Sequence, residues 1–142
     1  MATYNTVFET TRPQDEAFEY LATFSNAEQW DPGVEEGESM TPGEPAVGSV
    51  YRLGVRLFGR VVPFEYRVLE LERPRRVVLQ ATHGRLVSTD TIMVEPSGSG
   101  ARVRYVANLE GRGVLRAASP LLSHFFNVMA DRAAAGLRAA LA

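Results

Sequence analysis

Apolar and polar residues alternate along most of the chain between Val50 and Glu110, which is the pattern of half-buried β-strands. Residues that favour turns interrupt this alternation at Gly59-Arg60, Glu72-Arg73-Pro74-Arg75, His83-Gly84 and Ser97-Gly98-Ser99-Gly100. Two strands joined by such a short turn form an antiparallel hairpin. The stretch therefore predicts five strands joined by four successive hairpins.

Closing each hairpin at its turn gives a register in which the apolar side chains of all five strands share one face. The expected opposing pairs, from the first hairpin to the last, are Val55–Phe64 and Leu53–Tyr66, then Val68–Leu79, then Ala81–Leu86 and Leu79–Ser88, then Asp90–Ala107 and Ile92–Tyr105. Charged side chains occupy the other face. Its arginines, which either bind an anion or are simply solvated, are Arg52, Arg56, Arg102 and Arg104.

Five hydrogen-bonding side chains interrupt the apolar face: Tyr51, Tyr66, Ser88, Asp90 and Tyr105. Burial of an acid among apolar residues raises its pKa and suits proton transfer. Asp90 is therefore a candidate general acid or base, with Tyr66 or Tyr105 as its partner. The alternative is a structural carboxyl, either paired with Arg132 or hydrogen-bonded to a tyrosine. The tyrosines either hold the polar end of a ligand or are core rings whose hydroxyls reach the surface.

The first fifty residues predict one strand, from Tyr4 to Thr10, followed by two short helices and a connecting segment. Thr11 or Arg12 is the expected N-cap of the first helix. The second helix ends at Trp30, since Pro32 disfavours a helical conformation for Asp31. The ring of Trp30, the only tryptophan, then lies at a turn, where it either packs in the core or contacts a ligand.

Residues 115–141 carry apolar side chains at helical spacing and predict one long helix with its start near Ser119 or Pro120. Some 22 residues would reach about 33 Å, enough to cross a sheet. Gly136 allows a close approach to neighbours near the end of the helix, whereas the first half carries large side chains. Core packing is the usual role of such residues, and the wall of a cavity is the alternative.

Composition narrows the possible functions. The 142 residues fit one domain, 1–142, and the net charge of -2 favours neither nucleic acid nor an anionic membrane as partner. Cysteine is absent, and neither His83 nor His124 has a ligand partner at metal spacing, so we expect no metal and no cofactor. The chain starts without an apolar leader and has no apolar run long enough to span a membrane. We therefore expect a cytoplasmic protein, as a monomer or homodimer.

The order of these features resembles the START-like or SRPBCC superfamily, and specifically its bacterial members of the polyketide cyclase/dehydrase type. The resemblance covers the whole chain and rests on Pro13 with Phe18-x-Tyr20-Leu21, on Trp30-Asp31-Pro32, on Ala101-Arg102-Val103-Arg104-Tyr105, and on Met129-Ala130-Asp131-Arg132 leading to Gly136-Leu137. It implies an α+β helix-grip fold. In that fold, a curved antiparallel sheet of six or seven strands wraps a long C-terminal helix, and two short helices follow the first strand.

The resemblance also implies a hydrophobic ligand cavity between the sheet and the last helix. The expected ligand-binding residues are Trp30, Tyr51, Leu53, Val55, Phe64, Tyr66, Leu79, Ala81, Ser88, Asp90, Ile92, Tyr105, Ala107, Leu122, Phe125, Phe126 and Met129. They predict binding of a lipophilic, ring-bearing or polyketide-like molecule by a carrier, sensor or storage protein.

Two other functions remain open at this point. The first is an aromatase, cyclase or dehydratase without a cofactor, in which Asp90 and a tyrosine transfer protons. The second is a stress-linked, partner-binding domain whose cavity is closed. An open apolar cavity faced by Asp90 and its tyrosine favours the enzyme, whereas a cavity filled by side chains excludes both small-molecule functions.

Overall fold

The computed structural model describes residues 2–57, 59–111 and 119–142. Within these ranges the strands are β1 (Ala2–Thr10), β2 (Val34–Ser39), β3 (Val50–Leu57), β4 (Arg60–Glu72), β5 (Arg76–His83), β6 (Leu86–Ser97) and β7 (Gly100–Gly111). The helical segments are α1 (Gln14–Ala22), the 3-10 helix η1 (Phe24–Asn26), α2 (Ala27–Trp30) and α4 (Ser119–Ala140).

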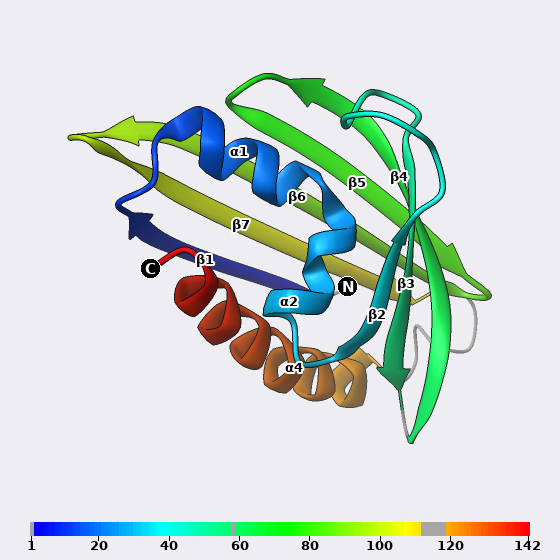
Figure 1. Ribbon diagram of the computed structural model, residues 1–142. Coiled ribbons are helices and arrows are strands. Elements are labelled where there is room, and N and C mark those ends of the chain that lie inside the picture. The colour runs from blue at the N-terminus through cyan, green and yellow to red at the C-terminus, as the bar shows by residue number, and fades with distance from the viewer. Residues whose placement is uncertain (1, 58, 112–118) are drawn as a thin grey trace.

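The strands form one antiparallel sheet in the order β1-β7-β6-β5-β4-β3-β2 (Figure 1). Strands β2 to β7 follow one another as neighbours, and β1 pairs with the last of them, β7. The sheet curls, and α4 lies along its concave side together with α1 and α2 (Figure 1). This arrangement confirms the α+β helix-grip fold with two short helical segments after the first strand.

The hairpins have the predicted faces, but two of them have a different register. Val68 pairs with Leu79 and Asp90 with Ala107, as expected. In the first hairpin Leu53 pairs with Phe64 instead of Tyr66, and in the third Ala81 pairs with Ser88 instead of Leu86. Both predicted registers were wrong by two residues.

The tighter turns explain this shift. In the third hairpin His83 pairs with Leu86, which leaves a two-residue turn in which Gly84 has a φ of 58°. A positive φ suits the short turns that match the twist of two antiparallel strands. A shift of two residues leaves every side chain on its original face, since side chains alternate with a period of two. The inner and outer faces predicted from the sequence are therefore retained.

Helix α1 begins one or two residues later than predicted. Its N-cap is Pro13, whereas the sequence suggested Thr11 or Arg12. Pro13 is extended, with ψ at 155°, and its carbonyl accepts the hydrogen bond of the Ala17 N–H at 2.9 Å. One face of the helix, including Phe18 and Leu21, is buried. The helix packs on β6 and β7 and so covers part of the concave face.

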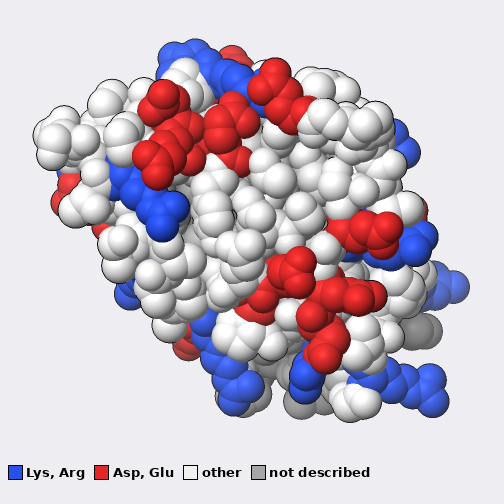
Figure 2. All heavy atoms as spheres, viewed as in Figure 1, with Lys and Arg blue, Asp and Glu red and all other residues white. Residues whose placement is uncertain are grey.

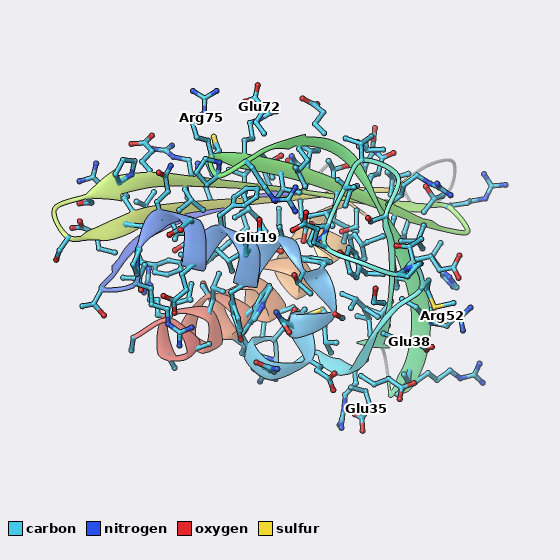
Figure 3. All side chains as sticks on the ribbon, turned by 45° about the horizontal axis from the view of Figure 1, so that its top comes forward. Glu19, Glu35, Glu38, Arg52, Glu72 and Arg75 are labelled. Carbon is cyan, nitrogen blue, oxygen red and sulfur yellow. The ribbon has the colours of Figure 1, made fainter. Side chains whose placement is uncertain are left out.

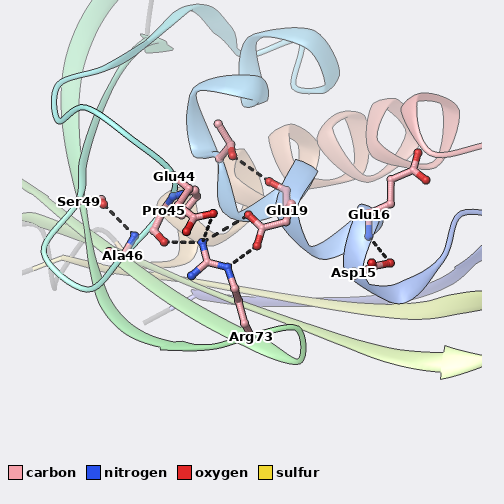
Figure 4. A network of polar contacts seen from close by, with 9 residues as sticks. Asp15, Glu16, Glu19, Glu44, Pro45, Ala46, Ser49 and Arg73 are labelled. Carbon is pink, nitrogen blue, oxygen red and sulfur yellow. Dashed lines mark hydrogen bonds and ion pairs between the residues drawn. The ribbon is translucent and has the colours of Figure 1, made fainter.

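Arg73, in the turn between β4 and β5, connects three segments that are distant in the sequence (Figure 4). Its guanidinium donates to the carboxylate of Glu19 on α1 and, at 2.6 Å, to the carbonyl oxygen of Pro45. The carboxylate of Glu44 lies 3.9 Å away. About a third of the Arg73 side chain is exposed, so water screens the charges, and the contacts mainly position α1 against the loop before β3.

Two of the four arginines of the outer sheet face, Arg52 and Arg56, form ion pairs with neighbouring carboxylates. Arg52 pairs with Glu65 at 3.0 Å, and Arg56 pairs with Glu35. Figure 3 shows Arg52 and Glu35 on the outside of their strands, away from the helices. For Arg52 and Arg56 the structure favours a solvated, ion-paired surface, and Arg102 and Arg104 are exposed.

Candidate functional site

A cavity of about 130 Å³ lies between the concave face of the sheet, α4 and the turn at Trp30 and Asp31 where α2 ends, here called the α2 corner. A single water needs roughly 10–15 Å³ of cavity, so this space is larger than a trapped solvent site. The lining residues are Tyr4, Thr6, Phe24, Ala27, Trp30, Asp31, Val34, Leu53, Val55, Leu57, Phe64, Tyr66, Leu86, Ser88, Asp90, Tyr105, Ala107, Leu109, Met129, Ala130, Ala133, Ala134 and Leu137.

The cavity brings together ten of the residues that the sequence suggested for ligand binding. They are Trp30, Leu53, Val55, Phe64, Tyr66, Ser88, Asp90, Tyr105, Ala107 and Met129. The side chains of Leu122, Phe125 and Phe126, also suggested, lie outside the described part of the protein.

Four further suggested residues, Tyr51, Leu79, Ala81 and Ile92, are buried but do not line the cavity. The inner face of the sheet is longer than the cavity, because α1 covers part of β6 and β7 and closes that end. Alternation along a strand identifies the inner face, but it does not show which half of that face a helix fills.

Sequence reasoning missed several lining residues. Tyr4 and Thr6 lie on the same face of β1 as the buried Phe8. Their alternation with polar residues could therefore have predicted that they face the interior. Ala130, Ala133 and Leu137 follow Met129 at helical spacing, so they were also accessible to the same reasoning. Asp31 gave no periodic signal, since it lies in the turn after α2, and only the fold brings it to the cavity.

A chain of hydroxyl groups leads to Asp90 inside the cavity. The Tyr66 hydroxyl donates to Ser88 Oγ at 2.9 Å, and Ser88 Oγ lies 3.5 Å from Asp90 Oδ1 in donor geometry. From the next strand, the Tyr105 hydroxyl donates to Asp90 Oδ2. The structure thus gives Asp90 the tyrosine partner, and the ion pairs of the described residues do not include one between Asp90 and Arg132.

Burial controls the protonation of this cluster. It raises the pKa of Asp90 to about 7, although the hydrogen bond from Tyr105 lowers it in part. Burial also raises the pKa of Asp31 to about 6, against the effect of the Gly33 N–H, which donates to Asp31 Oδ1 at 2.8 Å. The pKa values of Tyr66 and Tyr105 lie well above their usual value, first through burial and then through the nearby charge of Asp90. Asp90 is therefore able to exchange a proton near neutral pH, while both tyrosines stay protonated.

Trp30 both packs in the core and lines the cavity, so the two alternatives for its ring are compatible. Only 4% of the residue is exposed. Its ring meets those of Phe24 and Tyr105 edge to face, with centroid distances of 6.3 and 5.7 Å. The ring therefore links the α2 corner to the strand whose tyrosine is bonded to Asp90.

Among the described residues, no group of three His, Asp or Glu side chains is arranged to hold a metal ion. His83 instead packs beside Phe64, with ring centroids 5.2 Å apart. Helices long and apolar enough to cross a membrane are not found in the described ranges.

Residues 1–142 match the family described as "Polyketide cyclase / dehydrase and lipid transport". No curated protein has a sequence that matches this chain. A START superfamily protein from Mycobacterium smegmatis has a similar structure, with a TM-score of 0.78 and 13% identity over 99% of this chain and 97% of that one. A protein from Thermus thermophilus gives a TM-score of 0.69 and 14% identity over 99% of both chains.

The major latex-like protein 151 of Panax ginseng is also similar, with a TM-score of 0.61 and 12% identity over 92% of this chain and 97% of that one. At such low sequence identity, these structures show that the proteins share a fold, but they do not indicate which ligand this chain binds.

Proposed function

The chain belongs to the family of polyketide cyclases, dehydrases and lipid transport proteins, and from this premise we propose that it binds a lipophilic small molecule in the cavity beneath α4. The observation that carries this proposal is the cavity itself. Its wall is mostly aliphatic and aromatic, with a few polar groups, of which Tyr66, Ser88, Asp90 and Tyr105 form one hydrogen-bonded cluster. This is the usual composition of a small-molecule site. A core filled by side chains, which would exclude both small-molecule functions, does not fit a space of about 130 Å³.

The shape of the lining favours a ligand with a ring. Six aromatic side chains line the cavity: Tyr4 on β1 and a cluster of five, Phe24, Trp30, Phe64, Tyr66 and Tyr105. The five rings of this cluster pack on one another edge to face or stacked, as in the Phe24–Tyr66 pair at 4.9 Å and the Phe64–Tyr66 pair at 6.4 Å. A flat ring inserted among them gains the same contacts.

The test is to purify the protein under native conditions, extract it with organic solvent and identify the released molecules by mass spectrometry. We expect a lipophilic compound in amounts close to one per protein. Ala133→Leu fills the cavity from α4 and should reduce its amount, whereas Ala135→Leu adds the same volume on an exposed position of the same helix. Equal recovery from both variants, or no compound together with no binding of lipophilic probes, contradicts the proposal.

A second candidate function is proton-transfer catalysis on the bound molecule. The observation in its favour is that Asp90 faces the cavity, accepts a hydrogen bond from Tyr105 and has a pKa of about 7. Such a carboxylate suits the removal of the α-proton of a 3-hydroxy carbonyl compound. Asp90 takes up the α-proton, and the electron pair of the C–H bond forms the new C=C bond. Protonated Asp90 then passes this proton to the leaving hydroxyl, directly or through the Tyr105 hydroxyl, so that water leaves and Asp90 is a carboxylate again.

This candidate is tested with the N-acetylcysteamine thioester of 3-hydroxy-3-phenylpropanoic acid, whose dehydration gives an absorbing cinnamoyl thioester. Catalysis predicts product formation that Asp90→Asn abolishes without loss of substrate binding. No product from a protein that binds the thioester argues for a carrier or sensor instead.

A further inference from the structure

The charged groups among the described lining residues of the cavity are both acidic. Asp31 and Asp90 line it, and its described lining residues include no arginine and no histidine. Asp90, with 6% of its surface exposed, is deeply buried, and the charge of Asp31 acts on it unfavourably. A buried carboxylate without a cationic partner is costly, because the interior screens charge poorly and supplies little solvation.

We infer that the ligand of this cavity is a lipophilic amine, whose ammonium group pairs with the Asp90 carboxylate while its carbon skeleton fills the apolar lining. This inference rests on the proposed binding function and specifies its substrate class. An ammonium group supplies the missing positive charge and reduces the repulsion between Asp31 and Asp90. A ligand carboxylate or phosphate would instead add a third negative charge to a site whose described lining holds two carboxyl groups and no cation.

The aromatic rings near Asp90 also favour a positively charged group on the ligand. The Tyr105 hydroxyl is bonded to Asp90, and the Tyr105 ring meets that of Trp30 at a centroid distance of 5.7 Å. Faces of tyrosine and tryptophan rings attract cations, most strongly where water is excluded. An ammonium group beside Asp90 would therefore have both a carboxylate and aromatic rings as neighbours.

Arg138 contacts a lining residue from outside the cavity and does not change this balance. Arg138 donates to Thr6 Oγ1, a lining atom, at 3.0 Å, but Arg138 itself is exposed and does not line the cavity. On the face shown in Figure 2, acidic side chains gather over α1 and over the α2–β2 region. Such a surface attracts cations toward the Trp30–Asp31 corner and repels anions.

The test is isothermal titration calorimetry at pH 8 with three ligands that share one ring system: 1-naphthylmethylamine, 1-naphthalenemethanol and 1-naphthoate. We expect the amine to bind at least about tenfold more tightly than the naphthoate, with the alcohol between them. Asp90→Asn should remove the preference for the amine over the alcohol and retain alcohol binding. Glu95→Gln makes the same chemical change on an exposed position of β6 and should retain the preference.

Each other outcome has a definite meaning. Naphthoate binding as tightly as the amine overturns the amine inference and leaves the proposed function standing. A preference that persists in both Asp90→Asn and Asp31→Asn also overturns it, because the selecting charge then lies elsewhere. Failure of all three ligands to bind contradicts the inference and, together with an empty solvent extract, the proposed function.

Discussion

Gly136 on α4 lies directly against the backbone carbonyl oxygen of Trp30, so closely that a Cβ atom at position 136 would overlap that oxygen. This contact fixes the distance between the last helix and the corner that follows α2. Both segments contribute walls to the cavity, through Trp30 on one side and Ala133 and Leu137 on the other. The width of the cavity at this end therefore depends on a position without a side chain.

Gly136→Ala should destabilise the protein, although alanine is the better helix former. At an unhindered helix position the same change stabilises by about 1 kcal/mol. Here the added methyl group forces α4 away from Trp30, and we expect a net loss of about 1–3 kcal/mol in the free energy of unfolding, measured by urea denaturation.

The matched control is Ala135→Gly, since Ala135 is the exposed neighbour of Gly136 on the same helix. It should cost about 1 kcal/mol through helix propensity alone. A stabilised Gly136→Ala protein would show that α4 does not need its close approach to Trp30.

Trp30→Ala should cost about 3–5 kcal/mol in the free energy of unfolding, because it removes a buried ring that packs on Phe24 and Tyr105. Unfolding is best followed by circular dichroism, as the variant lacks the only tryptophan. Trp30→Phe retains much of the ring and should lose less. Nearly unchanged stability of Trp30→Ala would mean that the ring contributes to the ligand site and little to the core.

The sequence predicted which face of the sheet each strand residue occupies, but not whether the residue lines the cavity or lies in the core. Alternation along the strands placed Asp90 and Tyr105 on the inner face, and the fold confirms that face. It could not distinguish Tyr66, which lines the cavity, from Tyr51, which lies in the core beside it, since that difference depends on where the helices settle on the sheet. Likewise, the sequence indicated a close approach at Gly136 but not that its partner is the Trp30 carbonyl.

Asp31, a lining residue that the sequence did not predict, shows a second limit of sequence patterns. Turn residues have no period, so no pattern associates them with a face, and the Asp31-Pro32-Gly33 sequence alone is explained by the turn it makes. Its place beside the cavity results from the packing of α2 on β2, which follows it in the chain, and on α4, which is distant in the sequence.

The contribution of Asp90 to the stability of the protein should decrease as pH rises from about 4 to 7. In the unfolded chain Asp90 has an ordinary pKa of about 3.9, whereas burial raises it to about 7 in the folded protein. Between these values the folded state retains a proton that the unfolded state has released. Stability from this group is therefore complete below about pH 4 and is lost by at most about 1.4 kcal/mol per pH unit up to the folded pKa.

Asp90→Asn should remove this dependence, so the measured quantity is the difference in the free energy of unfolding between the parent and the variant across pH 4–8. The free energy of unfolding of the variant should increase relative to that of the parent as pH rises. Asp31, with its pKa raised to about 6, contributes a slope of the same sign between about pH 4 and 6. A difference that is constant over this range would show that Asp90 titrates as an ordinary exposed acid.

Tyr105→Phe should raise the pKa of Asp90 further, because the Tyr105 hydroxyl donates to the Asp90 carboxylate and so favours its charged form. The carboxyl carbon of Asp90, followed by NMR through a pH titration, reports this pKa directly. Tyr66→Phe is the control, since the Tyr66 hydroxyl is bonded to Ser88. A fall in the pKa of Asp90 in Tyr105→Phe, or an equal rise in both variants, would contradict this hydrogen-bond arrangement.

The most direct test of the account is a calorimetric binding titration with the neutral probe 1-naphthalenemethanol, whose ring system suits the aromatic lining of the cavity. Saturable binding at one site is expected in the parent and in Ala135→Leu. Ala133→Leu should weaken it by at least about tenfold, because its side chain occupies the same space. Equal binding by the two leucine variants, with both folded, would show that the cavity beneath α4 is not where the ligand binds.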